Sequence, residues 1–257
     1  MLTLPGQATI EADHEDLFLE LGTALRQAAF DAVEARGVFH LALSGGSTPE
    51  PFYMRLVVDP LYRALPWQST HLWIVDERRV PESDPRSNMR MIRESLAAHV
   101  PMPENHVHAV PTQAADPAAE YEAEMADVFG IAPVPGAPVP KLDFVLLGMG
   151  SDAHTASLFP ESPALAEKVR WIANNDGPRV VPPARITMTY PLINNARRVV
   201  VLAVGAGKAP TLAKIAAQLS QSGPNIAELP ITGIAPGLQG GRLQWFLDTA
   251  AAAGLNA

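Results

Sequence analysis

Apolar residues recur every three or four positions in several stretches of this chain. In 16–36 they stand at Leu17, Leu21, Leu25, Ala28, Ala32 and Val33. This spacing places them on one face of a helix, and Gly37 suits its end because glycine adopts the left-handed conformation of helix C-caps at little cost. Similar patterns predict helices over 48–58, 88–99, 116–129 and 208–219. We expect Asn88 and Asp116 to be N-caps and Pro49 to lie at an early helical position.

Shorter apolar runs without helical spacing predict strands. They cover 38–43, 71–75, 142–147, 169–173, 185–189, 199–204 and 244–247. The run 199–204 contains only Val, Leu and Ala, as expected for a central parallel strand covered on both faces. Strands alternating with helices predict an α/β fold with a doubly wound, mainly parallel sheet and helices on both of its faces. We expect residues 1–257 to form a single domain.

One stretch interrupts this alternation. The sequence IAPVPGAPVP at 131–140 holds four of the chain's 25 prolines. Proline lacks a backbone N–H and breaks regular helices and strand interiors. We therefore predict an exposed connector over 131–140.

Charge and composition narrow the classes of partner. The net charge of −8 disfavours nucleic acid, because phosphate backbones attract basic surfaces. There are no cysteines, which excludes disulfides and thiolate chemistry. No apolar run approaches the roughly 20 residues of a membrane span, and the N-terminus lacks the pattern of a signal peptide. We expect a cytoplasmic protein without a membrane partner, as a monomer or small homo-oligomer.

A glycine-rich turn follows the strand predicted over 38–43. The sequence LSGGSTP at 43–49 places Ser44, Gly45, Gly46, Ser47 and Thr48 between that strand and the next helix. Glycines let backbone N–H groups approach an anion, and the helix N-terminus adds free donors and the positive end of its dipole. The turn therefore predicts a phosphate or carboxylate cradle, although glycine and serine are also common in turns without a ligand. It lacks the spacing of nucleotide-binding loops.

A histidine and a carboxylate follow another buried strand. In LDFVLLGMGSDAHTASLFP at 142–160, Asp152 and His154 come just after Gly-Met-Gly. Open α/β sheets bind ligands at the carboxyl ends of their strands, and neutral imidazole is the usual general base near pH 7. We predict that His154 is a general base and that Asp152 orients it. The alternative is a structural histidine.

Three cations lie at the ends of other predicted strands. Arg78 stands in VDERRVP at 75–81, Arg185 in ARITMTYP, and Lys208 at the beginning of a helix after Gly-Ala-Gly. A cation at a helix N-terminus opposes the helix dipole, and a bound anion there would explain it. We predict that Arg78 contacts a substrate oxygen and that Arg185 and Lys208 bind an anion. Exposed surface charges are the alternative.

In this order, these blocks resemble the family of 6-phosphogluconolactonases and glucosamine-6-phosphate isomerases. The matching pieces are LSGGSTP at 43–49, VDERRVP at 75–81 with SN at 87–88, LLGMGSDAHTASLFP at 146–160, RITMTYPLINNARRVVVLAVGAGKA at 185–209 and LQWFLDTAAA at 243–252. The resemblance implies a Rossmann-like fold. It also implies hydrolysis of 6-phospho-D-glucono-1,5-lactone to 6-phospho-D-gluconate in the oxidative pentose phosphate pathway, without cofactor or metal.

The resemblance also implies residue roles. His154 matches the general base and Asp152 its neighbour. Arg78 matches an arginine near the lactone, the turn at Ser44-Gly45-Gly46 matches the substrate cradle, and Arg185 and Lys208 match cations that hold the phosphate in the wider superfamily. Two residues depart from the family pattern: Ala153 replaces a glycine and Ser151 an often-found proline. If position 153 requires a positive φ, alanine costs about 1 kcal/mol there.

Other functions stay open at the level of sequence. An amino-sugar-phosphate isomerase or deaminase would use a carboxylate such as Asp76 to move a proton, but such enzymes usually have tyrosine where this chain has Arg78. A non-catalytic sugar-phosphate-binding protein is a further alternative. Covalent catalysis by Ser151 or Ser157 is disfavoured because neither stands in a GxSxG turn.

Overall fold

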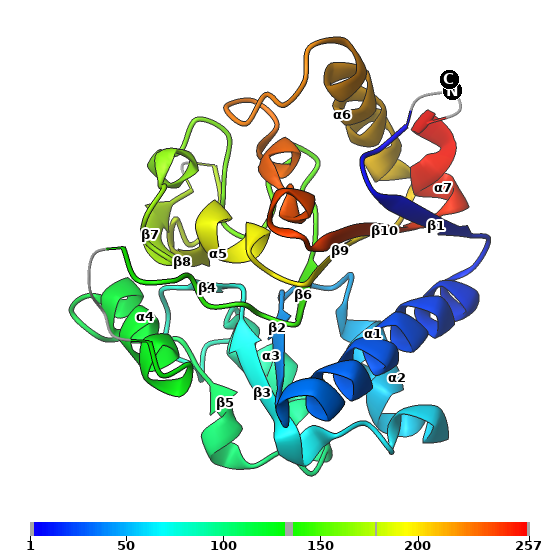
Figure 1. The fold of residues 1–257 in the computed structure, drawn as a ribbon. Coiled ribbons are helices and arrows are strands. Elements are labelled where there is room, and N and C mark those ends of the chain that lie inside the picture. The colour runs from blue at the N-terminus through cyan, green and yellow to red at the C-terminus, as the bar shows by residue number, and fades with distance from the viewer. Residues whose placement is uncertain (1–2, 132–135, 178, 256–257) are drawn as a thin grey trace.

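A seven-stranded parallel sheet forms the centre of the protein in the computed structural model, which describes residues 3–131, 136–177 and 179–255 (Figure 1). Its strand order is β1-β10-β9-β6-β2-β3-β5. The strands are β1 (Gln7–Glu11), β2 (Phe39–Leu43), β3 (Thr70–Ile74), β5 (Val107–His108), β6 (Phe144–Leu147), β9 (Arg198–Ala203) and β10 (Arg242–Asp248). Every pair of neighbouring strands is parallel. The predicted doubly wound α/β sheet is therefore confirmed.

Helices cover both faces of this sheet. They are α1 (His14–Arg36), α2 (Glu50–Val58), α3 (Asn88–Ser95), α4 (Pro117–Val128), α5 (Tyr190–Asn194), α6 (Ala209–Gln221) and α7 (Thr249–Ala252). In Figure 1, α1 and α2 lie on one side of the sheet and α6 and α7 on the other. Among the helices of the described ranges, none has the length and apolar character needed to cross a membrane.

The order of the strands places a crevice between β2 and β6. From β2 the chain proceeds through β3 to β5 at one edge, and from β6 it proceeds through β9 and β10 toward the other edge. Open α/β sheets bind ligands where the strand order reverses in this way. The loops that follow β2 and β6 are the glycine-rich segments singled out in the sequence.

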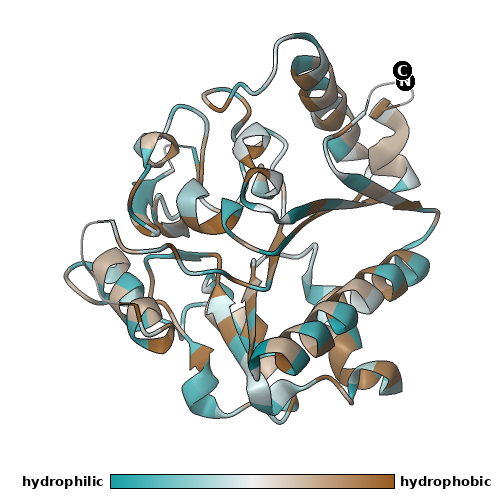
Figure 2. Cartoon of the chain, viewed as in Figure 1, coloured by the Kyte–Doolittle hydropathy of each residue, from teal (hydrophilic) through white to brown (hydrophobic). Residues whose placement is uncertain are grey.

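The strands beside this crevice are apolar throughout. All five residues of β2 and all four of β6 are buried, as are five of the six residues of β9. Figure 2 shows the same contrast, with brown hydrophobic residues in the central strands and teal polar residues on the outer side of α1. Each Å² of apolar surface that folding removes from water stabilises the protein by about 25 cal/mol. This core is therefore the main source of stability. It holds the loops at the strand ends on a rigid base.

A second sheet was not anticipated from the sequence. Its order is β4-β8-β7, with β4 (Asp76–Arg78), β8 (Ala184–Met188) and β7 (Ile172–Asp176) all antiparallel. The segment 76–78 is thus a strand rather than a loop. The strand predicted over 169–173 begins only at Ile172, because the carboxylates of Glu167 and Glu122 instead accept the backbone N–H groups of residues 168–172.

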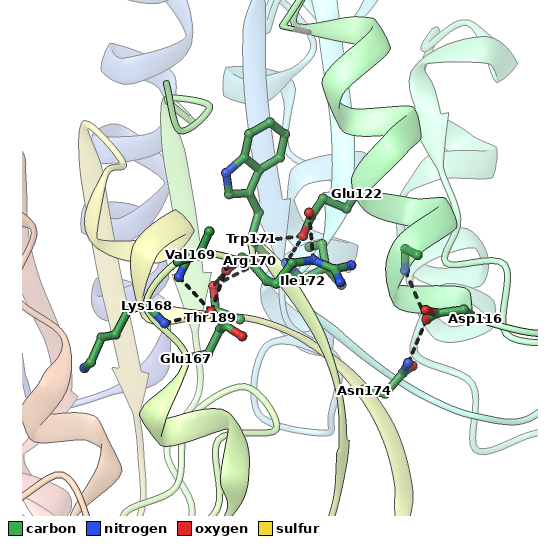
Figure 3. A network of polar contacts seen from close by, with 11 residues as sticks. Asp116, Glu122, Glu167, Lys168, Val169, Arg170, Trp171, Ile172, Asn174 and Thr189 are labelled. Carbon is green, nitrogen blue, oxygen red and sulfur yellow. Dashed lines mark hydrogen bonds and ion pairs between the residues drawn. The ribbon is translucent and has the colours of Figure 1, made fainter. Parts of the chain in front are cut away.

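Figure 3 shows how this small sheet is attached to α4. Glu122 accepts hydrogen bonds from the N–H groups of Trp171 (2.8 Å) and Ile172 (2.9 Å). Asp116 accepts from the side chain of Asn174 at 2.8 Å and also caps α4 through the N–H of Ala119. The predicted N-cap role of Asp116 is therefore confirmed, and the same carboxylate joins the helix to β7.

Two further sequence predictions need adjustment. The N-cap of α3 is Ser87, whose hydroxyl accepts from the N–H of Arg90, rather than Asn88. The helix predicted over 88–99 ends at Ser95, and a separate 3-10 turn follows Leu96. In the predicted connector, residues 132–135 lie outside the described residues, and 137–140 form neither helix nor strand. Strands β1 and β5 were missed.

Candidate active site

A cavity of about 340 Å³ opens at the carboxyl ends of β2, β3, β6 and β9. It is lined by Ser44, Gly45, Gly46, Ser47, Thr48, Pro49, Asp76, Arg78, Asn88, Gly148, Met149, Gly150, His154, Ala156, Phe159, Val180, Arg185 and Lys208. The structure therefore brings together nine of the ten residues that the sequence singled out. The exception is Asp152, which lies behind His154 and lines a neighbouring cavity.

His154 and Asp152 form a hydrogen-bonded pair at this cavity. His154 Nδ1 lies 2.6 Å from Asp152 Oδ1, and the backbone N–H of His154 donates to the same oxygen at 3.2 Å. The hydrogen bond from His154 lowers the pKa of Asp152, against an opposing effect of partial burial. A carboxylate accepts hydrogen bonds only, so it favours the tautomer with the proton on Nδ1. The lone pair is then on Nε2.

A tight turn holds the pair in place. The N–H of Gly150 donates to the carbonyl oxygen of His154 at 2.8 Å, and the N–H of Ala153 donates to that of Gly150 at 3.1 Å. A Cβ atom on Gly150 would come within 2.2 Å of His154 Nδ1 and 2.5 Å of Asp152 Oδ1. Glycine at position 150 is therefore a steric requirement of the pair.

Ala153 adopts the left-handed backbone conformation that glycine would favour at this position. Its φ is +64°, in the left-handed region, and its side chain is fully buried. Its carbonyl oxygen accepts a hydrogen bond from the N–H of Ile231 at 3.0 Å. The position thus requires the left-handed conformation even though it carries alanine.

The turn after β2 has the features of an anion cradle. Gly46 has a φ of +108°, and a Cβ atom on Gly45 would lie 2.0 Å from Asn88 Oδ1. Tyr53 of α2 donates its hydroxyl hydrogen to the carbonyl oxygen of Ser44 at 2.6 Å, which fixes the beginning of the turn. Pro49, the N-cap residue of α2, provides no side-chain cap, so the N–H donors of this helix and its dipole favour an anion there.

Arg78 of β4 and Arg185 of β8 are directly opposite each other on adjacent strands of the small sheet. Like charges directly opposite one another destabilise a sheet. Burial lowers the pKa of Arg185, and the nearby charge of Arg78 lowers it further. Arg185 Nε donates to the carbonyl oxygen of Pro182, and Arg78 Nη1 to that of Arg86. The carboxylates of Asp76 and Glu77 raise the pKa of Arg185 and so offset part of this repulsion, and an anion between the two guanidinium groups would offset more of it.

Lys208 supplies a third cation from the other side of the crevice. Its Nζ donates to the carbonyl oxygen of Met149 at 2.7 Å, which directs the ammonium group over the end of β6. It immediately precedes α6, as predicted. The cation and the helix N-terminus together favour an anionic ligand group.

Several polar atoms of the cavity wall are buried without a partner. Within the part of the chain that the structure describes, these include Ser44 Oγ, Arg78 Nε and Asn88 Oδ1. Buried polar groups nearly always form hydrogen bonds, so unpartnered ones call for an explanation. The residues that carry these atoms line one cavity together with three cations, an arrangement that favours a polar, negatively charged ligand.

Sequence reasoning missed part of the cavity wall. Asp76 was considered only for an alternative activity, and Asn88 only as a helix cap, yet both line the cavity. Of the neighbouring charges, Glu77 is turned away: it is 1% exposed and accepts hydrogen bonds from the N–H groups of Asn88 and Met89. Arg79 instead donates to the carbonyl oxygen of Ala114.

Known proteins are similar to this chain in sequence and in fold. Residues 12–245 match the family model of glucosamine-6-phosphate isomerases and 6-phosphogluconolactonases. The chain is 41% identical to a 6-phosphogluconolactonase of Nostoc sp., over 98% of this chain and 97% of the relative. It is also 41% identical to one of Synechocystis sp., over 88% of each chain. The solved 6-phosphogluconolactonase of Trypanosoma cruzi superposes with a TM-score of 0.83 at 26% identity, over 100% of this chain and 99% of that one.

Proposed function

Since the chain belongs to the family of glucosamine-6-phosphate isomerases and 6-phosphogluconolactonases, we propose that it is a 6-phosphogluconolactonase. The reaction adds water to C1 of 6-phospho-D-glucono-1,5-lactone and opens the ring to give 6-phospho-D-gluconate, a step of the oxidative pentose phosphate pathway. The observation that carries the proposal is that His154, hydrogen-bonded to Asp152 from behind, lines the same cavity as Arg78, Arg185 and Lys208. A general base and an anion site therefore share one wall.

His154 is the general base in this proposal. Its Nδ1 is engaged by Asp152, so Nε2 takes a proton from water as the water oxygen attacks C1. General-base catalysis typically contributes about 10²- to 10⁴-fold. Asp152 favours the resulting imidazolium through its negative charge. The imidazolium then returns its proton to the ring oxygen as the C1–O bond breaks, which leaves a carboxylic acid that ionises in water.

The oxyanion that forms at C1 needs hydrogen-bond donors. Arg78 offers a guanidinium group in the cavity wall. Donors placed in advance where charge develops stabilise the transition state more than the substrate. We assign this role to Arg78, with backbone N–H groups of the turn at Gly45-Gly46 as further donors.

The phosphate provides binding energy away from the reacting carbon. Arg185, Lys208 and the turn formed by Ser44, Ser47 and Thr48 supply cations, hydroxyl groups and the N-terminus of α2. Interactions with a remote group orient the ring for attack. Covalent catalysis by Ser157 is disfavoured because its hydroxyl is fully buried and donates to Asp76.

A timed assay tests the proposal. Fresh 6-phosphogluconolactone is supplied, and the product is oxidised by 6-phosphogluconate dehydrogenase. We expect turnover above spontaneous hydrolysis, and a fall of about 10²-fold or more in kcat for His154→Ala. A His154→Ala enzyme within a few-fold of wild type would exclude the base assignment. Lys208→Ala should mainly raise KM, and an unchanged KM would exclude its phosphate role.

Glucosamine 6-phosphate serves as the control substrate. Ammonia release from it, without lactone hydrolysis, would show a deaminase instead. The expectations of a cytoplasmic location, of no cofactor and of a monomer or small homo-oligomer stay predictions.

A further inference from the structure

Asp76 is an acidic residue in the wall of the proposed active site that the mechanism above does not use. Its side chain is 8% exposed and lines the cavity beside Arg78 and Arg185. Among the described residues it forms no ion pair within 4.0 Å, unlike Asp143 at the amino end of β6, which binds both Arg36 and Arg197. Its charge acts on Arg185, whose pKa it raises, and its position in the cavity wall leaves the carboxylate able to accept a hydrogen bond from a ligand.

Ser157 holds this carboxylate from behind. Its hydroxyl is fully buried and donates to Asp76 Oδ2 at 2.6 Å. The backbone N–H of Ser157 donates to Thr187 Oγ1, and its carbonyl oxygen accepts from Asn175 Nδ2. The serine is thereby fixed to both β8 and β7. One oxygen of Asp76 is occupied by this contact, and Oδ1 forms no hydrogen bond among the described residues.

The place of Asp76 in the fold sets it across the crevice from the proposed base. His154 follows β6 and Asp76 follows β3, with β2 between them. Neighbouring strands lie about 4.8 Å apart, so the two strand ends are separated by about 10 Å. A sugar ring attacked at C1 by water from the His154 side would present its hydroxyl groups within this span.

We propose, building on the proposed lactonase function, that Asp76 binds a ring hydroxyl group of the sugar lactone and that Ser157 is the positioning residue that orients it. A carboxylate only accepts hydrogen bonds, and the hydroxyl groups of a sugar lactone are the donors that the substrate provides. A site built to pair with a hydroxyl group rejects an analogue that lacks it, because its own polar group is then left unpaired. Asp76 therefore selects polyhydroxylated lactones over deoxy lactones.

The test combines enzyme variants with altered substrates. Wild type, Asp76→Ala and Asp76→Asn are assayed by proton release on 6-phosphogluconolactone and on its 2-, 3- and 4-deoxy analogues. For wild type, we expect one deoxy analogue to lose about 10- to 100-fold in kcat/KM, the usual effect of a hydrogen bond to a charged group. In Asp76→Ala that penalty should fall to a few-fold at most, because the partner of the missing hydroxyl is gone.

Asp76→Asn keeps the shape of the side chain and guards against misfolding of the alanine variant. It should lower kcat/KM on the parent lactone and reduce the same deoxy penalty. Penalties that stay equal to wild type in both variants would overturn this inference alone. Absent turnover of the parent lactone by wild type would overturn the proposed function and this inference with it.

Ser157→Ala tests the positioning role. We expect about 3- to 10-fold lower kcat/KM, and no further loss when it is combined with Asp76→Asn, because contacting residues are not additive. Ser162→Ala is the matched control: its buried hydroxyl accepts from the same Asn175 Nδ2 but does not contact Asp76. Full additivity of Ser157→Ala with Asp76→Asn, or an equal loss in Ser162→Ala, would overturn the positioning role.

Discussion

One oxygen of Asp152 accepts two hydrogen bonds from His154, at 2.6 Å from Nδ1 and at 3.2 Å from the backbone N–H. The double contact ties the orientation of the imidazole to the backbone of its own loop. The side chains are partly open, 30% exposed for His154 and 46% for Asp152. Because the hydrogen bond lowers the pKa of Asp152, the carboxylate stays ionised under the conditions in which His154 would act as a base.

Asp152→Asn should therefore affect kcat more than KM. An amide can donate to Nδ1, which favours the wrong tautomer, and it lacks the charge that stabilises imidazolium. We expect kcat for lactone hydrolysis to fall about 10- to 100-fold, less than in fully buried pairs because water partly screens this one. Steady-state kinetics measures the effect. Asp31→Asn, on the exposed surface of α1, is the control, and equal kcat values for all three proteins would contradict the role of Asp152.

Position 153 gives a prediction for stability. Ala153 combines a φ of +64° with a fully buried side chain. Glycine would remove the conformational cost of about 1 kcal/mol. It would also remove a buried methyl group and raise the conformational entropy of the unfolded chain. Because these effects oppose one another, Ala153→Gly should change the free energy of unfolding by less than about 1 kcal/mol. Ala153→Val should cost more than about 2 kcal/mol, since β-branched residues rarely adopt this conformation. Urea denaturation distinguishes the two, and a tolerated valine would argue against a rigid left-handed turn.

The sequence predicted the inner strands of the central sheet because most of their residues are buried on both faces, whereas the edge strands β1 and β5 lack that pattern. Runs such as those of β6 and β9 are almost entirely apolar, and such a pattern is visible without knowledge of their neighbours. The small sheet offers a weaker signal, and only β8 was predicted close to its observed bounds. Its strands include DER in β4 and IANND in β7, which lack the alternation of a half-buried strand, and their pairing is stabilised by contacts to α4 and β8 that are remote in sequence.

The residues of the site also fall into those that a local sequence pattern reveals and those that only the fold brings together. His154, the turn at Gly45-Gly46 and Lys208 were found because glycines and polar residues follow apolar strands within a few positions. The contact between Ser157 and Asp76 joins residues 81 positions apart. Only the folded arrangement of β3, β6 and β8 brings them together, so no local pattern could reveal it.

The attachment of the small sheet to α4 gives a second stability prediction. Glu122 accepts from two backbone N–H groups and from Arg170 Nε at 2.9 Å (Figure 3). Glu122→Ala leaves the N–H groups of Trp171 and Ile172 without their acceptor, so we expect a loss of about 1 to 3 kcal/mol in the free energy of unfolding.

An exposed glutamate is the matched control for this change. Glu228 forms a 3.8 Å ion pair with Lys214, and both side chains are more than 60% exposed. Surface ion pairs contribute little, so Glu228→Ala should change the free energy of unfolding by less than about 0.5 kcal/mol. Equal effects of the two substitutions in urea denaturation would show that the Glu122 contacts do not fasten β7.

Stacked histidines at the β5 edge of the sheet predict acid sensitivity. His71 Nδ1 lies 2.8 Å from His108 Nε2, and its ring stacks on that of His106 at 4.0 Å. Trp73 Nε1 donates to His40 Nδ1 at 3.2 Å. Burial, followed by nearby histidines, lowers the pKa of His40 to about 3 and that of His71 to about 4. The folded protein thus holds both rings neutral at pH values where free histidine, with a pKa near 6.5, takes up a proton.

Unfolding therefore takes up protons between pH 6.5 and about 4. The contribution of these rings to stability is complete above pH 6.5 and is lost as the pH falls, by up to about 1.4 kcal/mol per pH unit for each ring. Urea denaturation of wild type at pH 7.5, 6.0 and 5.0 should show this decline.

His40→Asn keeps an acceptor for Trp73 Nε1 but cannot titrate, so its free energy of unfolding should decline less steeply over the same range. His71→Gln should act in the same direction with a smaller effect, because that ring is partly exposed. Slopes equal to wild type in both variants would show that other groups cause the acid sensitivity.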